Sequence, residues 1–197
     1  MPMKVVVEPH NTRWAAMFNR ASTEIHQALG PNVTTVHHIG STAIPTIYAK
    51  PIIDILVEVA SIAVVDAHSR AMEALGYEAM GEFGIPGRRY FRRDDDRGVR
   101  THHAHTFEAG SLEIDRHLAF RDFLLENPTW AQQYSELKRR LVEAHPDDIQ
   151  AYMDGKDAYI KNVDQQAAEW QRGRTRRHRP PATEMKNPSH AAAPDSS

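Results

Sequence analysis

The residues best suited to chemistry lie close together, where a glycine and a serine precede a lysine and an aspartate. Gly40 and Ser41 follow a predicted strand and begin a loop that ends at Lys50, and Asp54 lies in the next predicted strand. A glycine lets the backbone approach a ligand closely, and a serine hydroxyl with nearby amides can donate hydrogen bonds to phosphate oxygens. The pair therefore predicts a phosphate-binding loop, and Lys50 could reach the same phosphates.

Asp54 is the one acid in the otherwise apolar stretch 51–57. An ionised carboxylate on a buried strand is costly unless it is paired or binds a metal. Mg²⁺ prefers carboxylate oxygen and bridges to substrate phosphates, so it would give this acid both a partner and a role. The other interpretation is an ordinary Gly-Ser turn, with Asp54 paired to Lys50 or to an arginine. The spacing alone leaves both interpretations open.

Two histidines on one predicted strand could complete a metal site. Within the strand 99–107, His103 and His105 point to the same face because side chains alternate along a strand. They could bind a metal ion together with Asp54, or bind a phosphate or carboxylate of a substrate. The alternative is a strand edge with solvated histidines. The chain has no cysteine and no His-Glu-x-x-His sequence, so a dedicated zinc site is not expected.

Four arginines lie in or beside another predicted strand, 88–93. Because the guanidinium fork matches phosphate geometry, Arg88 and Arg89 are candidate clamps for a triphosphate. The alternative is pairing with the acidic turn 94–96, which is the interpretation we favour for Arg92 and Arg93.

The helical second half offers a further, less specific set of side chains. Lys138 and Lys156, with Tyr152, could face a nucleotide in a cleft. We favour solvated lysines, because a lysine on a long helix is usually exposed. For Arg121 beside Asp122 we favour a structural role, in which the arginine locks its helix to the sheet.

The periodicity of apolar residues changes along the chain, as in a mixed fold. Strands concentrate in the first half and long helices in the second, which predicts the α+β class. The acidic turn 94–98 joins two of the strands as a hairpin. The expected strands are 4–8, 33–39, 51–59, 77–82, 88–93 and 99–107, and the expected helices are 13–29, 63–75, 111–126, 129–144 and 147–170.

Length and composition indicate one globular domain, residues 1–170, followed by a tail. The tail, 171–197, is basic and rich in proline and alanine, so we expect it to be disordered. The domain itself is net acidic, which argues against a nucleic-acid partner because such binding depends on neutralising phosphates. Since no apolar run approaches the length of a membrane span and no signal peptide is present, a cytoplasmic location without a membrane partner is expected.

Several segments resemble the GrpB family, and the matches run in order from Val5 to Ala168. The matching segments are His38–Thr42, Ala49–Ile55, Gly84–Phe91 and His117–Leu124, followed by Tyr134, Leu137–Lys138, Tyr152 and Gly155–Lys156. The resemblance implies the nucleotidyltransferase fold: a mixed β-sheet with helices packed on it and a C-terminal helical segment. It adds His38 and Thr42 to the expected phosphate-binding residues.

The function that this resemblance implies is binding of ATP or another nucleoside triphosphate with Mg²⁺, and nucleotidyl transfer to, or activation of, a small-molecule acceptor. Asp54, Ser41 and Lys50 would be the catalytic residues. The nucleotidyltransferase pattern has a second acid two residues after the first, where this chain has Leu56. A non-catalytic module that binds a nucleotide or a phosphorylated metabolite is therefore the alternative. A metal-dependent hydrolase that uses His103 and His105 is a third interpretation.

Overall fold

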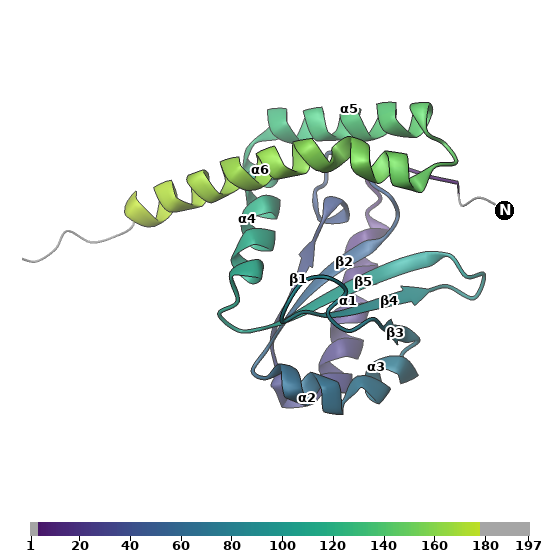
Figure 1. Ribbon diagram of the computed structural model, residues 1–197, viewed down its shortest axis with the longest axis vertical. Helices are drawn as coiled ribbons and strands as arrows, with labels where there is room; N and C mark the ends of the chain where they lie inside the picture. Colours follow the sequence, from purple (N-terminus) through teal and green to yellow (C-terminus); the bar gives the residue numbers. More distant parts are fainter. Residues whose placement is uncertain (1–3, 178–197) are drawn as a thin grey trace, which may run out of the picture.

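The computed structural model describes residues 4–177 and contains a five-stranded sheet with helices on both faces (Figure 1). The strands are β1 (Val33–Ile39), β2 (Ile53–Val59), β3 (Tyr77–Ala79), β4 (Arg89–Asp94) and β5 (Arg100–Glu108). The helices are α1 (Arg13–Leu29), α2 (Ile62–Ala67), α3 (Ser69–Ala74), α4 (Leu112–Glu126), α5 (Pro128–Ala144) and α6 (Ile149–Arg177), with short 3-10 turns η1 (Gly30–Asn32) and η2 (Ser41–Ala43).

The sheet has the order β1-β2-β5-β4-β3. The β2–β5 pair is parallel and the other three pairs are antiparallel, so the sheet is mixed. This order places β2 between β1 and β5, which explains its apolar residues on both faces. The predicted fold class, α+β with a mixed sheet, packed helices and a C-terminal helical segment, is confirmed.

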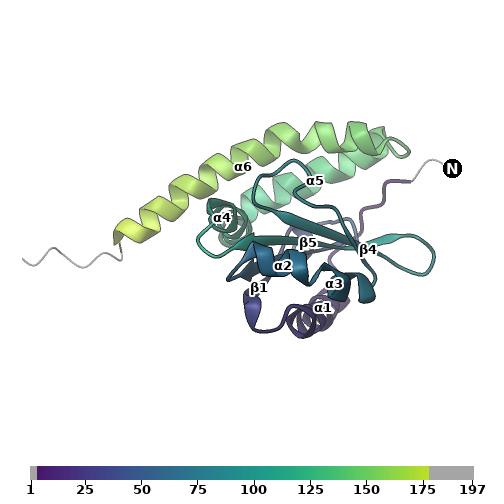
Figure 2. The same cartoon turned by 60° about the horizontal axis from the view of Figure 1, so that its bottom comes forward.

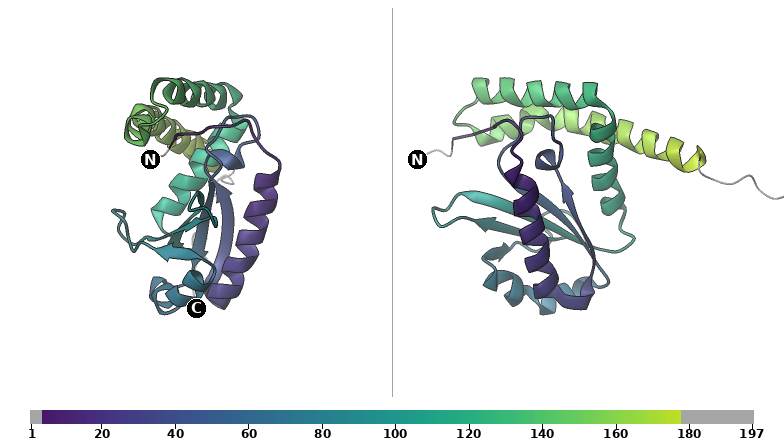
Figure 3. Two further views of the ribbon diagram at one scale, coloured as in Figure 1. Left: turned by 90° about the vertical axis from the view of Figure 1, so that its right-hand side faces the viewer. Right: turned by 180° about the vertical axis from the view of Figure 1, so that it is seen from behind.

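Alternation along β2 divides the core between the two faces of the sheet. On one face, Ile53, Ile55 and Val57 pack against α1, whose side chains Ile25 and Leu29 follow the helical spacing predicted for its buried stripe. The opposite face carries Leu56, which contacts the buried Phe107 of β5 and Ile114 of α4. Figure 3 shows α1 on one side of the sheet and α4 on the other, with α5 and α6 across the top of the view.

The helices α5 and α6 run side by side across one end of the sheet (Figures 1 and 2). The loop after β1 reaches into them, since Ile44 and Ile47 are buried in a cluster with the α5 residues Ala131 and Tyr134. The loop that carries Gly40 and Ser41 is therefore fixed between the sheet and the helical segment.

Most expected elements are present, with two differences in the first half. The expected strand 4–8 is reduced to one bridge between Glu8 and Ala49, because Pro9 follows it and cannot donate to a strand ladder. The expected helix 63–75 is interrupted at His68, whose ring binds the Val64 carbonyl oxygen at 2.8 Å, so α2 and α3 are separate.

The last helix continues beyond the boundary expected at Trp170. Its continuation is explained by contacts with α4, since Trp170 packs edge-on against Phe123 and Arg174 pairs with Glu126 at 2.5 Å. The remainder of the expected disordered tail, from residue 178, lies outside the described residues. None of the helices within residues 4–177 is both long enough and apolar enough to cross a lipid bilayer.

Candidate functional site

A cavity of about 280 Å³ opens between the sheet and the helices α4, α5 and α6. This volume is near the lower end of the range for small-molecule sites, roughly 300–1,000 Å³. Five predicted site residues, Gly40, Ser41, Thr42, Lys50 and Asp54, line it. The predicted metal ligands His103 and His105 line it as well. The fold thus brings most of the predicted site together at one cavity.

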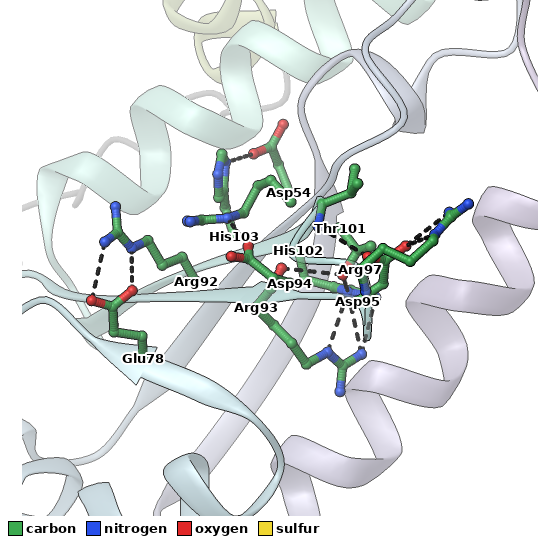
Figure 4. Close-up of polar contacts among 12 residues, drawn as sticks. Asp54, Glu78, Arg92, Arg93, Asp94, Asp95, Arg97, Thr101, His102 and His103 are labelled. Carbon is green, nitrogen blue, oxygen red and sulfur yellow. Dashed lines mark hydrogen bonds and ion pairs between the residues drawn. The ribbon is translucent and has the colours of Figure 1, made fainter. Parts of the chain in front are cut away.

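The strand register places Asp54 beside the two histidines. In the parallel β2–β5 pair, Asp54 lies opposite His103, and Leu56 lies opposite His105. The Asp54 Oδ1 atom is 3.1 Å from His103 Nδ1 and 3.9 Å from His105 Nε2. Figure 4 shows His103 directed at Asp54.

Asp54 is paired with imidazoles and not with a guanidinium or an ammonium. Across the described residues, its ion-pair partners are His103 and His105 alone. Burial raises the pKa of Asp54, but hydrogen bonds from the two histidines and their charges outweigh it, so the pKa lies well below its ordinary value. The interpretation in which Asp54 pairs with Lys50 or an arginine is wrong.

Gly40 is required by its approach to Asp54. Its φ of 69° lies in the left-handed region, and a Cβ atom added there would come within 2.3 Å of Asp54 Oδ2. Only a glycine fits, because any other residue would displace the carboxylate and adopt an unfavourable backbone conformation. The glycine thereby lets the loop lie directly against the acid.

Ser41 lines the cavity and is bound to Lys138, whereas the nearby His38 and Thr42 side chains are bound to each other. The Lys138 ammonium donates to Ser41 Oγ at 3.0 Å. Thr42 lines the cavity, but its hydroxyl donates to the Ile52 carbonyl oxygen and lies 3.0 Å from His38 Nε2. The His38 ring stacks on Phe18 of α1, outside the cavity lining, and burial lowers its pKa to about 4.

Three lysines line the cavity from the loop and from α5 and α6. Lys50 and Lys156 lie over the Tyr152 ring at 5.7 and 5.0 Å, and Lys138 lies over the Tyr134 ring at 4.3 Å. Within residues 4–177, none of the three forms an ion pair with a carboxylate. Three ammonium groups without acidic partners make this wall of the cavity suited to an anion.

Burial changes the titration of these lysines. It lowers the pKa of Lys138 to about 7, and the neighbouring Lys156 lowers it as well. Burial and Lys50 lower the pKa of Lys156 to about 8, and burial also lowers the pKa of Lys50. Lys138 is only 2% exposed, so the interpretation of Lys138 as a solvated lysine is wrong.

The spacing of these lysines from two tyrosines is a sequence signal for their burial. Lys138 follows Tyr134, and Lys156 follows Tyr152, each at a spacing of four, which puts each pair on one helix face. Tyr134 and Tyr152 are buried, so each lysine shares a buried face. His117 of α4 also lines the cavity, and we had not predicted it. Burial and the adjacent Arg116 lower the pKa of His117 to about 4.

The predicted triphosphate clamps Arg88 and Arg89 do not line the cavity. Arg88 is buried, donates to the carbonyl oxygens of Glu82 and Phe83, and lies 3.3 Å from His105 Nδ1. Arg89 is paired with Asp66. Arg88 therefore contacts the site through His105, whereas Arg89 is directed away from it.

The outer arginines pair with glutamates and not with the acidic turn. Arg92 pairs with Glu78 at 2.6 Å, which Figure 4 shows, and Arg93 pairs with Glu24 at 2.8 Å. The pairing of Arg92 and Arg93 with residues 94–96 that we favoured is therefore wrong.

The donor atoms at Asp54 fit some metal ions better than others. Asp54, His103 and His105 can each offer one atom, and these three atoms lie within 4.8 Å of one another. Mg²⁺ favours oxygen ligands in octahedral geometry, but Asp54 is the one acid among the described residues that line the cavity. Two imidazoles and one carboxylate therefore do not suit Mg²⁺.

Comparisons with known proteins agree with the resemblance read from the sequence. The family model described as GrpB protein matches residues 4–166. The chain is 44% identical over 171 residues to the UPF0157 protein YqkA of Bacillus subtilis, covering 87% of this chain and 49% of YqkA. It thus spans about half the length of that relative. It is 31% identical to the glutamate-rich protein GrpB of Alkalihalophilus pseudofirmus, of which it covers 94%.

A solved structure of the conserved protein GrpB from Enterococcus faecalis superposes with a TM-score of 0.80 and 44% identity. The match covers 84% of this chain and 99% of that one. The Cid1 poly(U) polymerase superposes with a TM-score of only 0.43 and 10% identity, too weak a likeness to carry an argument.

Proposed function

Because this chain belongs to the GrpB family, whose model covers nearly all of its folded part, we propose that its cavity binds a nucleoside triphosphate together with a divalent cation. The protein then transfers a nucleotidyl group to, or activates, a small-molecule acceptor. The observation that carries the proposal is the presence of two kinds of groups in one cavity. The first kind comprises Asp54, His103 and His105, and the second comprises three lysines that form no ion pair with a carboxylate among the described residues.

The lysine wall supports a phosphate-bearing ligand. Lys50, Lys138 and Lys156 lie in a cavity where burial makes their charged form costly and lowers the pKa of each. A triphosphate chain offers the negative charges that would offset this cost, and its binding would raise the pKa of each lysine toward the ordinary value. Ser41 accepts from Lys138 and also forms a hydrogen bond with Tyr134, so its side chain is held at the cavity wall where a phosphate would bind.

The same groups support chemistry at phosphorus. Phosphoryl and nucleotidyl transfer depend on positioning and on stabilising the charge that spreads over the phosphate oxygens. Ammonium groups that are already fixed in a partly dry site stabilise this charge without reorganising during the reaction. In this proposal Lys50 and Ser41 orient the phosphates, and Asp54 helps to hold the cation.

Binding of ATP to three forms of the protein tests the proposal. Lys138→Met keeps the volume of the side chain but removes its charge. We expect it to weaken ATP binding, measured by calorimetry, by at least about tenfold, or about 1.4 kcal/mol. Lys161→Met is the matched control, because Lys161 lies exposed on α6 and pairs with Asp157 at 2.7 Å. Equal affinities of both variants for ATP would contradict the proposed site.

Release of pyrophosphate separates an enzyme from a binding module. Leu56 stands where a second acid would serve a two-metal reaction, which is the observation that favours a non-catalytic module. With a divalent cation and candidate acceptors present, the enzyme should release pyrophosphate, and Asp54→Asn should abolish the release while the protein stays folded. Binding of ATP without any release would identify the module.

A further inference from the structure

The cluster of Asp54, His103 and His105 has a composition that selects among metal ions. It offers two imidazole nitrogens and one carboxylate oxygen, all on the sheet wall of the cavity. Imidazole suits Zn²⁺, Fe²⁺, Cu²⁺ and Ni²⁺, whereas carboxylates, carbonyls and water suit Mg²⁺, Ca²⁺ and Mn²⁺. Two histidines with one carboxylate on one side of an ion leave its other positions open to a substrate.

We propose that this cluster is a binding site for an imidazole-preferring divalent transition metal, and that Mg²⁺ does not bind there. This inference specifies which type of cation takes part in the proposed function. It rests on that function only for the claim that the bound ion contacts a phosphate of the nucleotide. The site itself follows from the donor atoms and their separations.

The surroundings of the cluster supply no oxygen ligands that would convert it into a magnesium site. Leu56 takes the next position on the same face of β2 and is fully buried. Glu58 follows on that face, but its carboxylate pairs with His37 at 2.6 Å. Asp54 is therefore the one acid of β2 that is available at the cavity.

Neighbouring side chains hold both imidazole rings in place. The Tyr90 ring lies 5.5 Å from the His103 ring and 5.2 Å from the His105 ring, measured between centroids. Arg88 Nη1 donates to His105 Nδ1, which leaves Nε2 as the nitrogen directed at Asp54. A metal ion at Nε2 would leave the ring proton on Nδ1. Arg88 would then give up this bond and keep its two carbonyl acceptors.

Metal titrations of the full chain, freed of metal and without nucleotide, test the inference. We expect Zn²⁺, Co²⁺ and Ni²⁺ to bind with a stoichiometry of one, and millimolar Mg²⁺ neither to bind nor to compete. His103→Ala and His105→Ala should each weaken Co²⁺ binding by more than the roughly 10–100-fold that loss of an outer-shell partner costs. His68→Ala is the control, because His68 lies exposed beside α2.

One further measurement tests the site without any substitution. Cu²⁺ bound to the unaltered protein should show nitrogen couplings in pulsed EPR, which requires no variant to fold. Mg²⁺ binding that competes with Co²⁺, retention of Co²⁺ affinity in both folded histidine variants, or absence of nitrogen couplings would overturn the inference.

The inference and the proposed function fail separately. If ATP binds in the presence of a chelator while Co²⁺ does not bind, the cation site is wrong and the nucleotide site stands. If Co²⁺ binds at the histidines while ATP does not bind with or without it, the reverse holds.

Discussion

At the scale of single residues, the contact between Gly40 and Asp54 determines the shape of the cavity wall. Gly40→Ala should destabilise the protein by about 1–2 kcal/mol through its left-handed backbone alone, with a further cost from the clash with Asp54. It should also weaken ATP binding, because the carboxylate must move. Chemical denaturation and calorimetry measure the two effects.

Gly98→Ala is the matched control for the destabilisation that comes from the positive φ alone. Gly98 also has a positive φ, 75°, but an added Cβ atom there meets nothing within 4 Å. Its substitution should destabilise the protein less and leave ATP binding unchanged. If the two variants behave alike, the close approach of Gly40 to Asp54 has no functional role.

Lys138 should make the stability of the protein depend on pH. Its pKa is lowered from 10.5 to about 7 in the folded protein, mainly by burial and further by Lys156. Between these values the unfolded chain binds a proton that the folded protein lacks, so the free energy of unfolding should rise with pH. The contribution reaches at most about 1.4 kcal/mol per pH unit.

Comparison with Lys138→Met isolates this effect, because the other groups that face Lys138 remain. These groups are Ser41 from η2, Tyr134 from α5, and Tyr152 and Lys156 from α6. Denaturation from pH 7 to 10 should show a steeper rise for the unaltered protein than for the variant. Parallel curves would mean that Lys138 is charged throughout this range.

Individual site residues were predictable only where the sequence itself is unusual. Asp54 stands out as one acid in an apolar strand, and Gly40 with Ser41 stands out as a turn with hydrogen-bond donors. Lys138 did not stand out, since an isolated lysine on a long helix fits a solvated face equally well. Its burial depends on the cavity that two other parts of the chain create.

At the scale of elements, the loop after β1 is held against α5 by a side-chain hydrogen bond. The Tyr48 N–H donates to Ser135 Oγ at 2.9 Å, and Ser135 is buried. Ser135→Ala would leave this N–H without its partner, which should cost about 1–3 kcal/mol of stability and weaken ATP binding. Thermal denaturation and calorimetry measure both.

Gln132→Ala provides the comparison on the same helix. Gln132 donates to the Thr46 carbonyl oxygen of the same loop at 3.2 Å, but this bond is exposed. Its loss should change stability by less than about 0.5 kcal/mol. An equal effect of the two substitutions would show that Ser135 does not position the loop.

The elements were more predictable than their pairing. The bounds of α1 and β1 agree with the apolar periodicity, because each has a clear repeat and a stop signal at Gly30 or Gly40. The parallel pairing of β2 with β5 joins segments about fifty residues apart, and no local pattern specifies it. The proximity of His103 to Asp54 follows from that register, so the sequence allowed it but could not establish it.

At the scale of the whole molecule, the cavity forms where the β-sheet meets the C-terminal helical segment. The sheet supplies rigid positions for Asp54, His103 and His105, and the helical segment supplies Lys138 and Lys156. Lys50 comes from the loop before β2, so the helical segment supplies two of the three lysines. The alternating strands and long helices predicted the two parts, but the space between them depends on packing that only the three-dimensional structure contains.

A crystal structure of the protein with Co²⁺ and a nonhydrolysable ATP analogue is the most direct test of the proposed site. We predict phosphate oxygens within hydrogen-bond distance of Ser41 and Lys138. We also predict an anomalous peak for Co²⁺ between Asp54 and the imidazoles of His103 and His105. A nucleotide bound elsewhere, or phosphates directed away from the three lysines, would contradict the proposed site.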